Sequence, residues 1–430
     1  MLIELKFKNF RSFNNEVTLS MVASSDKSSP NNLFTKDSFS KRKLLCSAVI
    51  YGPNASGKTN IIEAVNFIDN FVNNSAERKP DTEIEFRQFL LADNPNNKPS
   101  EFEVSFIDQE DNRYQYGFHL DNKKVIKEWL VAYPKGLPQT WFEREHLGSL
   151  GSKPKYYFGR NLKGKNNQIS ELTRPDVLFL TNAAKLNHKQ LSNVYTWFKD
   201  SLRVLNGQDM TPFFFNFTAS RAKKDPKIFN KITQFLQIAD LGISGFDIHE
   251  KIYTEKDFSD DFPAEIKKQF INQKHLEVSL RHNYGENKEV YFPLEEESSG
   301  TQNLFALSGP LIDVLENGWV LFVDELDSSL HPLMTRFIVE LFHNPKINTK
   351  GAQLIFNTHD TTLMDCCIFR RDQIWFVEKD NKGCSHLYSL LEYSPRKNEA
   401  LAKGYLIGRY GAIPFFGEPQ WGNMENAEKQ

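Results

Sequence analysis

The chain has 430 residues and a formal net charge of −2, with 40% hydrophobic and 13% aromatic residues. This composition favours a globular protein of two or three domains, and it excludes a general electrostatic attraction to nucleic acid, which would need a local basic patch. The N-terminal residues lack the apolar core of a signal peptide and no apolar stretch reaches the ~20 residues of a membrane span, so we expect a cytoplasmic protein without membrane contact.

The first predicted elements are short strands. Residues 2 to 21 alternate apolar and polar side chains as paired antiparallel strands do, with Leu5 and Phe7 on one face of the first strand. A stretch rich in Ser, Asn and Lys follows from about residue 24 to 43, and it predicts a loop.

The most specific motif is "GPNASGKT", which follows an apolar run ending at Tyr51 and precedes a stretch with helical periodicity. This order predicts a strand, a loop and a helix, in which loop N–H groups and the helix N-terminus face the phosphates of ATP. Lys58 would bridge the β- and γ-phosphates during catalysis, and the Thr59 hydroxyl would bind Mg²⁺. The residues assigned to the nucleotide here are Gly52, Pro53, Asn54, Ala55, Ser56, Gly57, Lys58, Thr59 and Asn60.

The regions after this loop differ in their periodicity. From about residue 82 to 175, strand-like pieces between turn signals predict a β-rich lobe made of hairpins. From 176 to 290, "KQLSNVYTWFKDSLRVL" and "PKIFNKITQFLQIADLGI" have helical spacing, which predicts a helical subdomain and then a hairpin with Gly285 at its turn. Residues 291–430 alternate helices and strands as in a mostly parallel sheet, and they complete the domain that residues 1–81 begin.

Three motifs of the C-terminal part carry further chemistry. In "WVLFVDELDSSLHP" a strand ends in two carboxylates, at the sheet edge where ligands of open α/β sheets bind. Asp324 would hold Mg²⁺ through its water shell, and Glu325 would accept a proton from the attacking water. Before this strand, "SSGTQ" predicts a serine-capped helix start at which Gly300 lets a phosphate approach. After it, "QLIFNTHD" predicts a strand ending in His359, which can reach a γ-phosphate.

The order of these four motifs resembles that of ABC-type ATPases. The resemblance implies that residues 328–331 cross a dimer interface and that His359 is the switch histidine. Two positions depart from the usual pattern, because Thr301 replaces a glycine and His331 replaces an aspartate. The signature motif would comprise Ser299, Gly300 and Gln302.

The segment "NFRSF" resembles the first strand of the chromosome-maintenance and RecF-like branch of these ATPases. This likeness implies that Asn9, Arg11 and Ser12 lie near the nucleotide. Gln88 in "EFRQFLL" would be the glutamine that contacts the metal and links the nucleotide to movement of the lobe.

Most of the chain resembles the AAA-type ATPases of the Rlo and abortive-infection L group, notably in "LFLTNAAKLN", "DELDSSLHP" and "YLIGRYGAIPFFG". Membership would imply an α/β, ABC-type ATPase head of mixed and parallel sheets with flanking helices, an inserted β lobe and a helical subdomain. It would also imply an ATP- and Mg²⁺-dependent homodimer or higher oligomer in prokaryotic anti-phage defence, with a nuclease or toxin partner, Toprim-like or HNH, encoded nearby. About seventy residues follow His359 without a cluster of acidic motifs, so any nuclease would act in trans.

Alternative interpretations remain open at this point. The chain could be a RecF-like repair ATPase that clamps DNA, or a nucleotide-gated binding module with little turnover, which Glu325 disfavours. The basic stretches 220–227 and 394–403 are either weak contacts to nucleic-acid phosphates or solvated faces. "GYLIGRYG" either docks a partner or is a turn punctuated by glycines.

Overall fold

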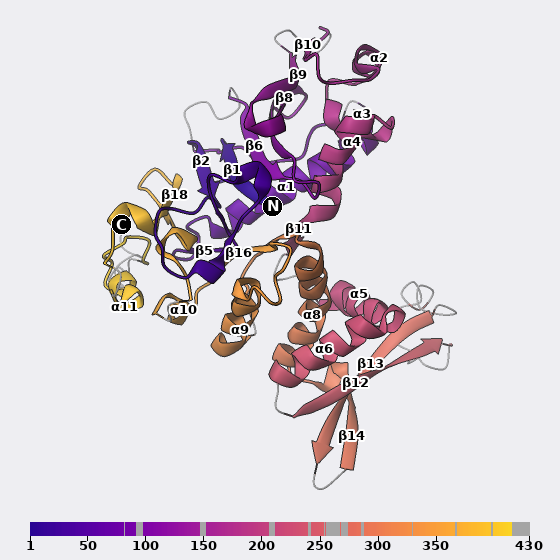
Figure 1. The fold of residues 1–430 in the computed structure, drawn as a ribbon, viewed down its shortest axis with the longest axis vertical. Helices are drawn as coiled ribbons and strands as arrows, with labels where there is room; N and C mark the ends of the chain where they lie inside the picture. The colour runs from indigo at the N-terminus through magenta and orange to yellow at the C-terminus, as the bar shows by residue number, and fades with distance from the viewer. Residues whose placement is uncertain are drawn as a thin grey trace, which may run out of the picture.

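The computed structural model describes residues 1–80, 82–91, 98–146, 152–205, 211–239, 242–252, 254, 267, 274–284, 288–328, 330–365, 368–396 and 399–414. Their strands form a large antiparallel sheet, a large mostly parallel sheet, a three-stranded sheet and a two-stranded pair (Figure 1). Helices flank these sheets, so the predicted α/β class with mixed and parallel sheets is confirmed.

The antiparallel sheet has seven strands in the order β10-β9-β8-β7-β6-β1-β2. β1 pairs with β2 on one side and with β6 on the other, where Leu5 lies opposite Val104. The hairpins of residues 100–158 therefore extend the sheet that β1 begins. The division of the chain near residue 81 stays a prediction, and strands on both sides of it share this sheet. The strands are β1 (Leu2–Lys8), β2 (Val17–Ser20), β6 (Ser100–Ile107), β7 (Arg113–Leu120), β8 (Val125–Ala132), β9 (Gln139–Glu145) and β10 (Lys155–Phe158).

The second large sheet has six strands in the order β11-β15-β16-β5-β17-β18, and only β18 runs antiparallel. All residues of β5, β15 and β16 are buried, as expected for parallel strands covered on both faces. Their carboxyl ends lie at one edge, which brings the predicted motifs together. The strands are β5 (Ser47–Tyr51), β11 (Leu202–Leu205), β15 (Val320–Val323), β16 (Gln353–Asn357), β17 (Ile374–Lys379) and β18 (Ser385–Ser389).

The prediction of helix through residue 205 was wrong. The helix α4 (Lys189–Thr196) continues as one wide turn over Trp197–Ser201, and residues 202–205 then form the strand β11. β11 pairs in parallel with β15 at the sheet edge, and its backbone hydrogen bonds there outweigh the helical spacing of its apolar side chains.

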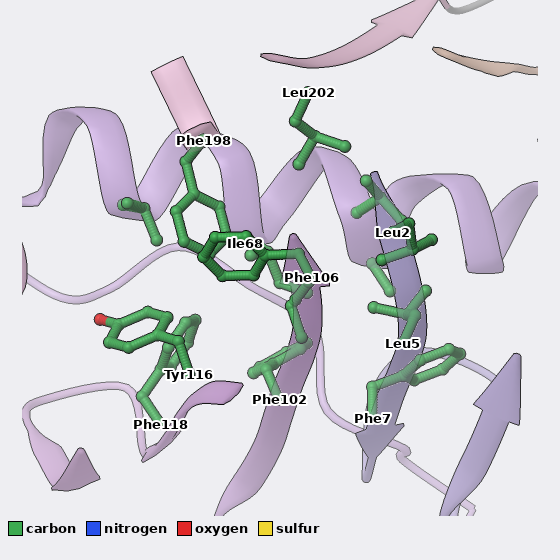
Figure 2. Packing of buried hydrophobic residues seen from close by; sticks show 14 of the residues in the cluster. Leu2, Leu5, Phe7, Ile68, Phe102, Phe106, Tyr116, Phe118, Phe198 and Leu202 are labelled. Atoms are coloured by element: carbon green, nitrogen blue, oxygen red, sulfur yellow. The ribbon is translucent and has the colours of Figure 1, made fainter. Parts of the chain in front are cut away.

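Helix α1 (Lys58–Asn74) lies between the two large sheets. Figure 2 shows Ile68 of this helix beside Phe102 and Phe106 of β6, with Leu5 of β1 next to them. One core cluster joins these side chains to Phe322 of β15 and its neighbours, so the sheets and the helix form one packed unit.

A lobe of three helices packed against the three-stranded sheet lies in the lower part of Figure 1, and one core cluster joins it to the parallel sheet. Asp225 accepts a hydrogen bond from the Lys227 N–H at 2.8 Å, which supports the predicted helix start at Pro226. The predicted hairpin β13–β14 is present, and its turn at Gly285 lies outside the described residues. The elements are α5 (Thr211–Lys224), α6 (Pro226–Ala239), α8 (Ser299–Asn317), β12 (Ile243–Ile252), β13 (Lys274–Tyr284) and β14 (Lys288–Pro293).

Helix α8 contains Pro310, which has no N–H and therefore leaves the carbonyl of Ala306 without its helical partner. The hydroxyl of Thr218 on α5 donates a hydrogen bond to this carbonyl at 3.0 Å. Gly309 allows the approach, because a Cβ at this position would lie 2.4 Å from the Thr218 hydroxyl oxygen. Thr218 of α5 thus supplies the hydrogen bond that Pro310 cannot donate to the Ala306 carbonyl of α8.

Seven further strands and α-helices belong to the described residues. They are β3 (Leu33–Phe34), β4 (Leu44–Leu45), α2 (Asn166–Glu171), α3 (Phe179–Lys185), α9 (Pro332–His343), α10 (Thr362–Asp365) and α11 (Leu401–Leu406). Within the described part of the chain, every helix is too short or too polar to cross a membrane.

Candidate nucleotide-binding site

The phosphate loop, residues 52–59, follows β5 and leads into α1 as predicted. Gly57 has a φ of 114°, and a Cβ on it would lie 2.6 Å from the Ser385 hydroxyl oxygen. A Cβ on Gly52 would lie 2.2 Å from the carbonyl oxygen of Val377 on β17. Both glycines are therefore required by close packing of the loop against the β17–β18 hairpin.

Lys58 is buried at the start of α1, and its ammonium donates hydrogen bonds to the carbonyls of Gly52 at 2.8 Å and Pro53 at 3.0 Å. Burial lowers the pKa of Lys58, and the nearby carboxylates of Glu325, Asp324 and Asp327 oppose this effect. The predicted cation and the predicted carboxylates thus belong to one electrostatic cluster.

Three polar side chains hold the phosphate loop in place. The Ser385 hydroxyl, at the start of β18, donates to the carbonyl of Ser56 and also bonds the Ser12 hydroxyl at 2.8 Å. The Asn60 amide donates to the same Ser12 oxygen at 2.7 Å. The loop is therefore fixed to the N-terminal segment and to the C-terminal hairpin at once.

The carboxylate strand end, residues 324–327, follows β15. Glu325 has a φ of 52°, a conformation that non-glycine residues rarely adopt. The side chain of Asn357, the last residue of β16, donates to a carboxylate oxygen of Asp324 and accepts the Glu325 N–H at 2.5 Å. The Asp324 carboxylate and the Glu325 backbone are thus held by the neighbouring strand β16.

His359 lies two residues beyond the end of β16, and its side chain is exposed. Its N–H donates to a carboxylate oxygen of Asp327 at 3.1 Å. The switch-histidine segment and the carboxylate strand end are therefore neighbours. Residues 328–331, which the sequence resemblance predicts to cross a dimer interface, come directly after the carboxylate strand end. Ser329 lies outside the described residues.

The predicted signature segment starts α8 with Ser298 as its N-cap, whose hydroxyl accepts the Thr301 N–H at 3.1 Å. Ser299 is exposed, and the Gln302 amide donates to the carbonyls of Glu295 and Glu297 just before the helix. Glu297 also pairs with His282 of β13 at 2.7 Å. The signature segment therefore belongs to the lobe of α5, α6 and β12–β14.

Three residues assigned to the nucleotide or metal make protein contacts. The Asn9 amide donates to the carbonyl of Lys98 at 2.8 Å and accepts the Phe89 N–H at 3.2 Å. Gln88 donates to the same Lys98 carbonyl at 3.0 Å, and Arg11 pairs with Glu63 of α1 at 3.2 Å. Their roles toward a nucleotide stay predictions.

Unpartnered polar atoms in the cluster fit a Mg²⁺-bound triphosphate. The hydroxyl of Ser56 and one carboxylate oxygen of Asp327 are buried and have no hydrogen-bond partner among the described residues. Buried polar groups of this kind are usually satisfied, and phosphate oxygens or a hydrated cation would satisfy them here. Lys58 and the exposed Thr59 would hold the phosphates and Mg²⁺, with Asp324 on the metal's water shell.

A second group of ligand-type side chains lies in the β17–β18 turn, where atoms of Asp380, Cys384 and His386 lie within 4.8 Å of one another. One Asp380 oxygen accepts the N–H groups of Lys382 and Cys384, and the other pairs with His386 at 2.9 Å. The hydrogen bonds of the turn account for this arrangement.

Sequence reasoning missed Asn357 and Ser385. The sequence could have indicated Asn357, because it is a polar residue at the end of the apolar run "LIF", where a predicted strand ends. Ser385 had none, since its contact with Ser56 joins residues 329 positions apart.

The chain was compared with curated proteins and with solved structures. None of the curated proteins matches the chain. Solved structures that resemble it include the SMC head domain from Thermotoga maritima, at 14% identity and a TM-score of 0.38, covering 90% of this chain and 98% of that one. A second is an Smc head domain bound to the C-terminal domain of ScpA, derived from Pyrococcus furiosus, at 13% identity and a TM-score of 0.42, covering 94% and 98%. A third is the recombination mediator RecF with ATP, at 13% identity and a TM-score of 0.37, covering 90% and 98%.

A family model described as "AAA domain, putative AbiEii toxin, Type IV TA system" matches residues 47–365. This range spans the phosphate loop, the signature segment, the carboxylate strand end and His359, and it covers well over half of the chain. The chain therefore belongs to this AAA domain family.

Proposed function

We propose that this chain is an ABC-type ATPase that hydrolyses ATP as a homodimer and controls a nuclease or toxin effector in a prokaryotic anti-phage defence system. The observation that carries the ATPase part is the cluster of Lys58 with Asp324, Glu325 and Asp327. They follow the carboxyl ends of β5 and β15, the two parallel strands that flank β16. Such a cluster combines phosphate binding, metal binding and a proton acceptor.

The place of the signature segment supports the proposed homodimer. Its hydrogen bonds run within itself, and Glu297 pairs with β13, in the lobe of α5, α6, α8 and β12–β14 rather than at the phosphate loop. A second copy would place the exposed Ser299 and the adjacent N–H groups of α8 over the nucleotide. Each site would then draw its loop from one subunit and its signature from the other.

The defence setting rests on the family description, which names a toxin of a toxin–antitoxin system, and on the sequence resemblance to abortive-infection ATPases. The effector, Toprim-like or HNH, would be encoded nearby and bound in trans. With a net charge of −2, binding of nucleic acid by the ATPase alone would be weak and steeply salt-dependent.

The test measures phosphate release by purified variants. Lys58→Ala should abolish hydrolysis and weaken ATP binding, because it removes the charge that faces the phosphates. Glu325→Gln should slow hydrolysis by ~10²- to 10⁴-fold while ATP stays bound, since it removes a positioned proton acceptor. The control substitutions Lys346→Ala and Glu340→Gln, at exposed positions on and after α9, should leave hydrolysis unchanged. Wild-type turnover in Lys58→Ala would refute the ATPase assignment.

The same variants test the biological role in cells that carry the gene with its natural neighbours. Lys58→Ala should remove protection in a phage plating assay, and the wild-type chain should co-purify with a neighbouring effector. Loss of DNA repair without any change in phage plating would instead support the RecF-like alternative.

A further inference from the structure

The side chain of Asn357 bonds both the carboxylate of Asp324 and the backbone N–H of Glu325. Asn357 is fully buried at the end of β16. Its own carbonyl accepts the Leu326 N–H at 3.3 Å. Three consecutive residues of the carboxylate strand end are thus bonded to this one asparagine.

The chemistry of the contacts requires an amide. The Asn357 oxygen must face the Glu325 N–H, because a carboxylate oxygen of Asp324 can only accept and so needs the NH₂ group. An aspartate would keep the acceptor for Glu325 but would set a second carboxylate against Asp324. An alanine would remove both bonds.

The hydrogen bond from the Glu325 N–H to Asn357 holds Glu325 in an unusual backbone conformation, with a φ of 52°. A positive φ at a non-glycine residue is strained and persists only where its surroundings hold it. The Asn357 oxygen holds the N–H of this residue, which sets the direction in which the Glu325 side chain leaves the backbone.

We propose that Asn357 is a positioning residue for ATP hydrolysis, which orients Asp324 toward the metal and Glu325 toward the attacking water. The proposal deepens the proposed function and rests on it. Residues that orient metal ligands and catalytic bases commonly contribute about 10- to 100-fold in metal affinity or activity.

Asn357 also connects three parts of the site through the backbone. The next residue, Thr358, donates its N–H to the carbonyl of Ile50 on β5 at 3.3 Å, two residues before the phosphate loop. His359 donates its N–H to Asp327.

The first measurement uses the protein without nucleotide. Hydrogen–deuterium exchange followed by mass spectrometry should show faster exchange in the peptide around residues 324–328 of Asn357→Ala, because the Glu325 N–H loses its acceptor. Asn357→Asp keeps that acceptor and should exchange more slowly than Asn357→Ala. The matched control is Asn348→Ala, which removes a buried amide bonded to Phe342 and Ala352 and should leave this peptide unchanged.

The second measurement separates binding from turnover. Asn357→Ala and Asn357→Asp should lower kcat by about 10- to 100-fold and raise the Mg²⁺ concentration for half-maximal activity by about tenfold. ATP affinity without Mg²⁺ should be that of the wild type. Asn348→Ala should lower the melting temperature while its kcat per folded molecule and its Mg²⁺ dependence stay unchanged.

The outcomes separate this proposal from the proposed function. Wild-type kcat and Mg²⁺ dependence in folded Asn357→Ala would overturn the positioning role, and so would an equal kcat loss in Asn348→Ala. If the wild-type protein hydrolyses no ATP, the proposed function fails. The exchange rates, and the gain in ATP affinity that Mg²⁺ brings, which Asn357→Ala should reduce, would then still show whether Asn357 orients Asp324 and Glu325.

Discussion

Gly52 shows how a single position limits the phosphate loop. A Cβ there would meet the Val377 carbonyl at 2.2 Å, and a backbone atom of a central strand cannot turn aside. We expect Gly52→Ala to push the loop away from β17 and to abolish measurable ATP binding in a fluorescence titration, although the protein still folds. Gly136→Ala is the control, because its φ of 78° brings strain of roughly 1–2 kcal/mol while no atom lies within 4 Å of the new Cβ. Wild-type affinity in Gly52→Ala would contradict the described packing of the loop.

At the same scale, the sequence predicted the residues with local signals and missed those with distant partners. Lys58, Asp324 and Glu325 stand in short motifs whose spacing already indicates a strand end, and the structure brings them into one cluster. Asn357 and Ser385 act through contacts across the sheet, and a linear pattern does not encode which strands are neighbours. Ser298 was predictable as an N-cap because capping depends on adjacent residues.

Elements were predictable where periodicity and pairing agree. The hairpins of residues 100–132 alternate clearly, and the structure pairs them as expected. Residues 202–205 have helical spacing but form β11, because a parallel partner from residues 320–323 is available in space. A partner more than a hundred residues away leaves no trace in local periodicity.

The pair of α5 and α8 supports a prediction at the element scale. Thr218→Val should lower the free energy of unfolding by ~1–2 kcal/mol, because the Ala306 carbonyl opposite Pro310 would be buried without a partner. Thr218→Ser keeps the hydroxyl, so its free energy of unfolding should fall by less than that of Thr218→Val. Urea unfolding measures the difference.

The control for this prediction lies on α6, where the Thr233 hydroxyl bonds the Phe229 carbonyl of its own helix and the side chain is only partly buried. Thr233→Val should stay within ~0.5 kcal/mol of the wild type. If both variants lost the same free energy of unfolding, the Thr218 hydrogen bond to the carbonyl opposite Pro310 would contribute no more than an ordinary one.

At the scale of the whole molecule, the sequence indicated the α/β class and the mostly parallel C-terminal sheet, whereas the joining of β1 to β6 could not be predicted. Antiparallel order depends on which strand edges meet, and these two strands are separated by the phosphate loop and all of α1. The long shared core around α1 is the physical result of that joining.

The composite site of the proposed dimer gives the prediction at this scale. Lys58→Ala and Ser299→Arg should each be inactive alone, and an equal mixture should regain about a quarter of wild-type hydrolysis. Random pairing makes about half of the dimers mixed, and each mixed dimer has one intact site of two. Activity across mixing ratios, with mass measurements of Glu325→Gln in the presence and absence of ATP, tests this.

Two results would contradict this prediction. One is a mixture that stays inactive although mixed dimers are shown to form, which would mean either that the sites are not composite or that both sites must fire together. The other is hydrolysis that is first-order in monomer, together with a Glu325→Gln protein whose mass does not change on addition of ATP.

The position of β5 also has a consequence for protein synthesis. Its two neighbours in the sheet are β16 and β17, so both of its edges stay unpaired on the ribosome until residues 353–379 have been translated. An apolar strand with two open edges is a template for unwanted pairing, and we infer that the nascent chain needs shielding over that interval. The same order of events keeps an incomplete chain from forming its phosphate loop, which means that prematurely terminated products would be inert toward nucleotide.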